Sequence, residues 1–158
     1  MTKNHAAFME AAVALSRRTM ESNTGGPFGA VIVKDGEIVG EGWNRVTSDN
    51  DPTAHAEVTA IRDACRRLDS FSLEGCAIYT SCEPCPMCLS AIMWARLERV
   101  YYANAREDAA AIGFDDDMIY REIPLHPADR KVPAEQLDLP SARAVFAEWV
   151  DKADKIPY

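Results

Sequence analysis

The feature that most constrains this chain is a pair of cysteines at the start of a helix-like segment. Cys85 and Cys88 stand in the stretch Pro84-Cys85-Pro86-Met87-Cys88. Their i,i+3 spacing places both thiols on the same side of a helix. Pro86 suits a first helical turn, because its missing N–H would have no partner within the helix there. The partial positive charge at a helix N-terminus favours thiolates, so the pair predicts half of a metal site.

Hydrophobic periodicity and turn residues predict an alternation of helices and strands. We expect helices over residues 6–20, 54–68, 86–95, 105–112 and 141–153, strands over 28–33, 38–43, 76–79 and 100–103, and a weak short element over 118–123. Lys34-Asp35-Gly36-Glu37 supplies an Asp-Gly turn that joins the first two strands into a hairpin. Gly113 is expected to stop one helix, and Ser141 can cap the last one. Residues 44–51 read as a polar loop, and residues 125–139 as mostly irregular structure or an edge strand. This order predicts an α/β fold with a mixed sheet and helices on its faces.

Composition narrows the class of protein. The 158 residues contain no evident linker or repeat, which predicts a single domain over residues 1–158. A net charge of -8 lacks the positive field that nucleic acid requires. No apolar run approaches the length of a membrane span, and Glu10 interrupts the N-terminal apolar residues, unlike in a signal peptide. Five cysteines, three of them clustered, argue against a disulfide framework. We therefore expect a soluble cytoplasmic protein that binds neither nucleic acid nor membranes.

The missing metal ligand is expected at the start of the second helix. Two helices that begin at neighbouring strand ends can direct their N-termini to one point. His55, Cys85 and Cys88 would then hold one Zn²⁺ per chain and leave the fourth position to water, as in a catalytic site. The other histidines, His5 and His126, lack the spacing to complete a closed site.

Glu57 follows His55 by two residues and can lie near the metal without binding it. A carboxylate in that place can take a proton from metal-bound water and pass it to a leaving nitrogen. His-x-Glu followed by Pro-Cys-x-x-Cys is the pattern of zinc-dependent nucleobase deaminases, and this chain contains both parts in full. The two motifs together predict a zinc-dependent deaminase.

The three clustered cysteines leave one rival interpretation. Cys82, Cys85 and Cys88 have the spacing of three ligands to an iron–sulfur cluster. That pattern also needs a fourth cysteine followed by proline, and Leu89-Ser90 follows Cys88 instead. We interpret Cys82 as a loop residue whose backbone lines the pocket, and its role stays open.

Longer stretches of the chain resemble the cytidine-deaminase superfamily, and within it the bacterial guanine deaminases. Residues 25–33, 50–62 and 79–88 carry the resemblance. The first and third also fit tRNA-adenosine deaminases approximately. The stretch Gly113-Phe114-Asp115-Asp116 and the terminal Tyr158 favour guanine.

The resemblance implies a three-layer α/β/α cytidine-deaminase-like fold and a homodimer with an exchanged C-terminal segment. Residues 141–158 would form a helix and tail packed over an active site, either that of their own chain or the partner's. The implied reaction is hydrolytic deamination of guanine to xanthine and ammonia by a zinc-bound hydroxide. Glu57 would carry a proton to the ring nitrogen, and Asp116 would assist proton transfer to the departing amine.

The resemblance also implies which residues bind the purine base. They are Phe28, Asn44, Ala56, Trp94 and Tyr158. Phe28 would stack on the purine and Asn44 would hydrogen-bond its edge. Trp94 and Tyr158 would close the pocket, one or both from the partner chain. Structural roles are the alternatives: core packing for Phe28 and Trp94, a turn cap for Asn44, a frayed end for Tyr158 and, for Asp116, a solvated acidic run.

Other functions remain open at this level. The substrate could be another amino-purine, a nucleoside or triazine such as guanosine or ammeline, or adenosine in tRNA. A zinc-stabilised binding module without activity is the alternative from a different class. An intact Glu57 disfavours the latter, since a structural site has no use for a base beside an open coordination position.

Overall fold

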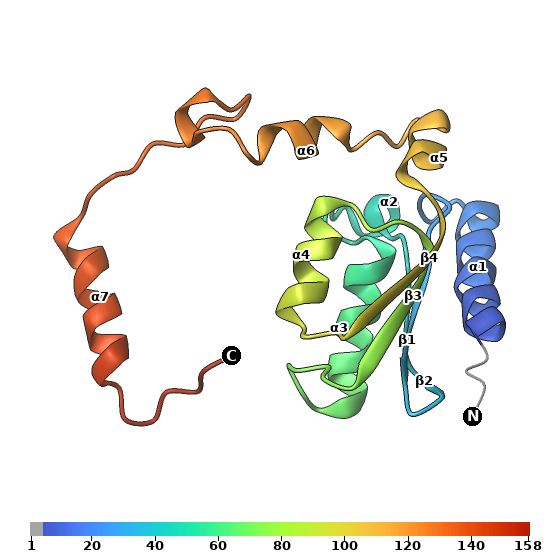
Figure 1. Cartoon of the computed structure of the whole chain (residues 1–158), viewed down its shortest axis with the longest axis horizontal. Coiled ribbons are helices and arrows are strands. Elements are labelled where there is room, and N and C mark those ends of the chain that lie inside the picture. Colours follow the sequence, from blue (N-terminus) through green and yellow to red (C-terminus); the bar gives the residue numbers. More distant parts are fainter. Residues whose placement is uncertain (1–4) are drawn as a thin grey trace. The chain divides into compact units, whose positions relative to one another are not determined.

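The computed structural model describes residues 5–158, which form two compact units: one ends at Asp116 and the other spans Asp117–Tyr158. The first contains α1 (His5–Ser22), β1 (Gly29–Lys34), β2 (Glu37–Trp43), α2 (Val46–Asp49), α3 (Ala56–Leu68), β3 (Cys76–Cys82), α4 (Pro86–Trp94), β4 (Arg99–Asn104) and α5 (Arg106–Ala111) (Figure 1). The second contains α6 (Asp117–Glu122), a 3₁₀ helix (Pro127–Asp129) and α7 (Pro140–Asp151). Each predicted helix and strand is present with slightly shifted ends, and α2 is an addition within the predicted polar loop.

The sheet of the first unit is mixed, as predicted. Its strand order is β2-β1-β3-β4, with β1 antiparallel to both of its neighbours and β3 parallel to β4. The hairpin turn uses Asp35 and Gly36, whose φ angles of 52° and 88° are both positive. The prediction that Cys82 lies in a loop is wrong, because Cys82 pairs with Asn104 and extends β3 beyond Tyr79.

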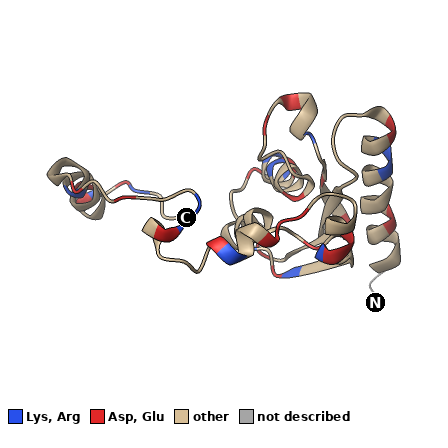
Figure 2. Ribbon diagram, turned by 90° about the horizontal axis from the view of Figure 1, so that it is seen from above, with Lys and Arg blue, Asp and Glu red and all other residues tan. Residues whose placement is uncertain are grey.

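Helices cover both faces of this sheet and give the predicted three layers (Figure 1). On one face, α1 packs through Leu15 against Val31, Val33 and Tyr79. The charged residues of α1 are exposed and include both signs (Figure 2). This amphipathic pattern is what the helical periodicity of the N-terminal segment predicts.

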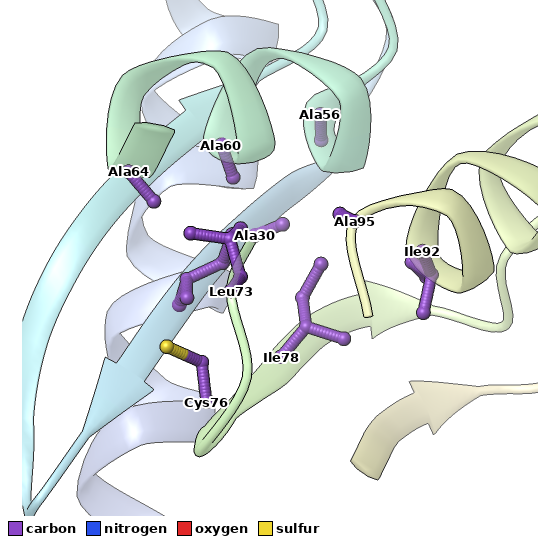
Figure 3. Packing of buried hydrophobic residues seen from close by; sticks show 10 residues of the cluster. Ala30, Ala56, Ala60, Ala64, Leu73, Cys76, Ile78, Ile92 and Ala95 are labelled. Carbon is purple, nitrogen blue, oxygen red and sulfur yellow. The ribbon is translucent and has the colours of Figure 1, made fainter. Parts of the chain in front are cut away.

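The opposite face carries the larger core, formed with α3 and α4 (Figure 3). Ile32 and Ile78 are fully buried there, and burying each such side chain contributes about 1.5–3 kcal/mol. The facing residues of α3 are alanines, so the helix approaches the sheet closely. At Gly42 of β2, a Cβ would lie 2.2 Å from the Ala56 carbonyl oxygen, so only glycine fits that contact.

The second unit exposes its apolar side chains. In α7 no residue is buried, and Phe146, Trp149 and Val150 are all exposed. This helix begins at Pro140, so the prediction that Ser141 caps it is wrong: proline takes the first helical position and shifts the start by one residue. That this unit belongs to the same domain as the first stays a prediction. Among residues 5–158, no helix combines the length and apolar composition needed to cross a membrane.

Candidate active site

One edge of the sheet gathers several of the residues that the sequence analysis singled out. Because β1 is antiparallel to both β2 and β3, the carboxyl ends of β2 and β3 lie at the same edge as the start of β1. The carboxyl end of β4, parallel to β3, lies there too. Phe28 precedes β1, Asn44 follows β2, and a three-residue segment, residues 83–85, joins β3 to α4. Open α/β sheets bind ligands at such strand ends.

Two helix starts bring three metal-binding side chains together at this edge. His55 is the N-cap of α3 and Cys85 is the N-cap of α4, and neither side chain makes a capping hydrogen bond. Both are therefore free to turn toward another partner. His55 Nδ1 lies 3.6 Å from Cys85 Sγ and 3.5 Å from Cys88 Sγ. The donor atoms of all three residues lie within 4.8 Å of one another.

These distances fit a tetrahedral zinc site. Zn–S bonds of about 2.3 Å and Zn–N bonds of about 2.1 Å at a tetrahedral angle put nitrogen and sulfur roughly 3.6 Å apart. The two observed nitrogen–sulfur separations, 3.6 and 3.5 Å, match that value. Nδ1 is the histidine nitrogen that faces both sulfurs, so it is the atom positioned for coordination. Three protein donors would leave one tetrahedral position open.

The two thiols also show why a cation belongs here. A hydrogen bond from Cys88, with a further contact to His55, lowers the pKa of Cys85 to about 4. The same contact with Cys85, followed by burial, raises the pKa of Cys88. The Cys85 thiol therefore gives up its proton more readily than an ordinary thiol, and the Cys88 thiol less readily. A metal ion favours the thiolate form of both.

Glu57 lies in the first turn of α3 and is 6% exposed. Burial raises the pKa of its carboxyl group. Thr80, in the middle of β3, donates a hydrogen bond from Oγ1 to Glu57 Oε1 at 3.1 Å. The structure thus places a buried carboxyl group of raised proton affinity beside the cysteine pair.

Phe28 and Asn44 lie opposite one another where the hairpin strands part. The Asn44 N–H donates to the Phe28 carbonyl oxygen at 3.1 Å. Asn44 is 5% exposed, and its Oδ1 accepts hydrogen bonds from the N–H groups of Gly26 and Val46, each at 3.2 Å. Asn44 therefore joins two loops, as the turn-cap alternative expected, and its amide nitrogen is the group left for a ligand.

Asp116 lies shortly after the end of α5, where the ring of Phe114 packs against Phe28. Gly113, with a φ of 95°, ends α5, and the Phe114 N–H donates to Ala109 O at 2.9 Å. This is the helix stop that the sequence predicts. The Phe114 ring packs edge-on against Phe28, with ring centroids 4.9 Å apart. Burial, followed by the charge of Cys85, raises the pKa of Asp116.

For the other three predicted substrate-binding residues, the structure gives their burial or exposure. The Ala56 side chain is fully buried in the core, so only its backbone N–H, in the first turn of α3, is suited to meet a ligand. Trp94 ends α4 and is 66% exposed, which argues against a core role. Tyr158 belongs to the second unit and is exposed. Its predicted contact with the site stays a prediction.

Sequence reasoning missed Thr80 and Phe114 as individual residues. Both stand inside stretches that it identified, residues 79–88 and 113–116. Thr80 has no distinctive sequence signal. Every second residue of a strand points to the same face, so the sequence alone does not show which one meets Glu57. Phe114 has one: an aromatic residue directly after a helix-stopping glycine often folds back onto its helix or a neighbour.

Comparisons with known proteins agree with this geometry. Residues 2–104 match the family model described as the cytidine and deoxycytidylate deaminase zinc-binding region. The guanine deaminase of Bacillus subtilis (strain 168) is 52% identical over 155 residues, which cover 98% of this chain and 99% of that protein. An X-ray structure of guanine deaminase from Bacillus subtilis superposes with a TM-score of 0.96 at 52% identity, covering 98% and 99% of the two chains. The tRNA-specific adenosine deaminase of Aquifex aeolicus is 45% identical over 96 residues, 61% of this chain and 63% of that one.

Proposed function

This chain belongs to the cytidine and deoxycytidylate deaminase family, and we propose that it hydrolyses guanine to xanthine and ammonia. The observation that carries the proposal is the convergence of His55 Nδ1 and the sulfurs of Cys85 and Cys88 beside the buried carboxyl group of Glu57. The donor set and its distances suit one Zn²⁺ per chain. Zinc held there would lower the pKa of a coordinated water to near neutrality and so supply a nucleophile.

The chain's own residues would manage the protons. Water adds its oxygen to C2 of guanine, and the bond from C2 to the exocyclic nitrogen breaks. One proton of the water ends on the ring nitrogen N3 and the other on the departing ammonia. Glu57 would take the first proton and deliver it to the ring, and its burial, which raises its pKa, supports that role. The raised pKa of Asp116 makes its protonated form more available for the leaving amine.

Hydrogen-bond roles at Asn44 support recognition of a purine edge. Because Asn44 Oδ1 already accepts from two backbone N–H groups, its amide nitrogen is left to donate. Guanine presents two neighbouring acceptors, O6 on its six-membered ring and N7 in its five-membered ring, that this amide nitrogen could meet. Phe28, held edge-on by Phe114, would stack on the ring. Selectivity for a neutral base must come from such contacts in a closed pocket.

Full-length similarity favours guanine over adenosine in tRNA. The Bacillus subtilis guanine deaminase matches 98% of this chain, whereas the Aquifex aeolicus tRNA enzyme matches 61%. The net charge of -8 also opposes binding to a phosphate backbone. On α3, Arg66 and Arg67 form ion pairs with Asp63, which reduces the charge they present to solvent.

All five cysteines are free thiols, which supports a reducing compartment such as the cytoplasm.

A substrate panel tests the proposal. The zinc-loaded protein is offered guanine, guanosine, adenine, cytosine, cytidine, ammeline and a tRNA anticodon stem-loop, and ammonia release is measured with a coupled assay. We expect guanine to have the highest kcat/KM, by about 10²-fold or more, because the site's buried polar groups stay unpaired with the wrong base. The Glu57→Gln protein, purified in parallel, controls for contaminating deaminases.

Two results of this panel would contradict the proposal. Ammonia from another compound with guanine inert would reassign the substrate within the deaminase family. A zinc-loaded protein that released no ammonia from any of these compounds would favour the binding module without activity.

We further propose that the chain acts as a homodimer whose C-terminal segment packs on the partner. An isolated helix of twelve residues is marginal in water, and α7 has twelve residues with Phe146, Trp149 and Val150 exposed. The tail Ile156-Pro157-Tyr158 adds two more exposed apolar side chains. A second copy of the chain supplies the surface that such a helix and tail need, and the tail would then close an active site.

Removal of residues 156–158 tests the role of the tail. We expect kcat/KM for guanine to fall by about 10–100-fold, because an open pocket admits water and loses the Tyr158 contact, with zinc content and dimer mass unchanged. Tyr158→Phe is the matched control: it keeps the ring, so a smaller loss there separates the aromatic cover from the hydroxyl. Full activity in the truncated protein would rule out the lid.

A further inference from the structure

We propose that Thr80 is a positioning residue that fixes the carboxyl group of Glu57 for proton transfer. The inference rests on the proposed deaminase function and deepens it. The Thr80 hydroxyl group contacts the Glu57 carboxyl group and the carbonyl oxygen of Cys82. In this role Thr80 is distinct from the acids that exchange protons.

The backbone at Thr80 is held on both sides. Thr80 lies in β3, where it pairs with Ala30 of β1 and with Tyr102 of β4. It is 1% exposed, so water does not compete for its hydroxyl group. The position of Oγ1 is consequently set by the pairing of β3 with both neighbouring strands.

The hydroxyl group reaches the catalytic carboxyl directly. Thr80 Oγ1 donates to Glu57 Oε1 at 3.1 Å, and Glu57 is itself only 6% exposed. The terminal torsion of a glutamate is broad and roughly two-fold, so without a partner the two oxygens exchange places freely. Donation from Thr80 to Oε1 favours one of these two arrangements, together with the contacts of the carboxyl group with Cys88 and with the Glu57 backbone.

A second contact ties this hydroxyl to the other half of the site. Thr80 Oγ1 lies 3.0 Å from the carbonyl oxygen of Cys82, the last residue of β3 before the segment that leads to Cys85. A hydroxyl has one proton and donates to one oxygen at a time, so both acceptors compete for it. Thr80 thus stands between the α3 half of the site, through Glu57, and the α4 half, through Cys82.

The test compares Thr80→Val, Thr80→Ser and Thr19→Val in the zinc-loaded protein. Valine keeps the shape and removes the hydroxyl, whereas serine restores it. Thr19 is also 1% exposed and donates to Leu15 O at 2.9 Å in α1, so Thr19→Val is the same loss of a buried hydroxyl away from the site. We measure kcat and KM for guanine, zinc content and the midpoint of thermal unfolding.

We expect Thr80→Val to lower kcat by about 10–100-fold with KM changed by less than about 3-fold, because misplacing a catalytic group costs turnover rather than binding. Thr80→Ser should stay within about 3-fold of wild-type kcat, and zinc content should be unchanged throughout. Thr19→Val should shift only the unfolding midpoint. In a Glu57→Asp background, whose shorter side chain withdraws from Thr80, Thr80→Val should add little further loss.

Several results would overturn the inference. Wild-type kcat in Thr80→Val would show that the hydrogen bond does not position Glu57. An equal loss in Thr80→Ser, or loss of zinc, would assign Thr80 to packing or to the metal site. If Thr80→Val lowered kcat by the same factor in the Glu57→Asp background as in the wild-type protein, Thr80 would act through a group other than Glu57. If the wild-type protein left guanine unchanged, the proposed substrate would fail, and the same comparison on the panel compound that is deaminated would still decide the role of Thr80.

Discussion

Replacing Glu57 with glutamine should lower kcat for guanine by about 10³–10⁴-fold while zinc stays bound. Glutamine has nearly the same shape, and its Oε1 can still accept the hydrogen bond from Thr80 that Glu57 accepts at 3.1 Å. What it lacks is an oxygen that takes up a proton. Because Glu57 is 6% exposed, bulk water cannot easily substitute for it as the base. The loss should therefore fall on kcat, with a smaller change in KM.

Glu98→Gln is the matched control for this substitution. Glu98 Oε1 accepts a hydrogen bond from Gly75 N–H at 2.9 Å in an exposed turn. Glu98→Gln therefore makes the same change of a hydrogen-bonded carboxylate to an amide, but away from the cysteine pair. Zinc is measured by metal analysis and turnover by ammonia release. Substantial turnover in zinc-loaded Glu57→Gln would remove Glu57 from the proton path and leave Asp116 as the candidate.

Local sequence signals predicted the elements that build the site. Asp35-Gly36 predicted the hairpin because only residues that tolerate positive φ fit the turn, and both have it. Pro86 and the two cysteines predicted the start of α4, which begins at Pro86. Since α3 and α4 begin at the same sheet edge, the encounter of His55 with the cysteines follows from topology.

Features that depend on partners across the sheet were beyond such signals. Cys82, two residues before Pro84, reads as a loop residue, yet it pairs with Asn104, and only the neighbouring strand makes it part of β3. Thr80 is one of several strand hydroxyls, and its contact with Glu57 requires the register of β3 against α3. The tail at Tyr158 is a harder case, because its proposed surface lies on another molecule.

Replacing His55 with alanine should remove nearly all bound zinc and lower turnover by at least about 10³-fold. His55 Nδ1 lies 3.6 Å from Cys85 Sγ and 3.5 Å from Cys88 Sγ. Without this nitrogen donor, only two sulfurs would remain as protein ligands, and two sulfurs alone hold the metal weakly. His126→Ala is the matched control, because His126 is exposed, accepts a hydrogen bond from Ala128 N–H and stands outside the cluster. A His55→Ala protein with one zinc per chain would disprove the ligand assignment.

Metal removal from the wild-type protein gives a second readout that does not depend on turnover. In the apo protein the pKa of Cys85, held at about 4 chiefly by its hydrogen bond from Cys88, leaves a thiolate at pH 6, and a thiolate is the form that alkylating reagents attack. Burial raises the pKa of Cys82 to about 11, so that thiol should stay unmodified under the same conditions. Iodoacetamide at pH 6, followed by peptide mass analysis, should therefore label Cys85 after chelation and spare it when zinc is restored. Equal labelling of Cys85 with and without zinc would mean that the metal does not bind this sulfur.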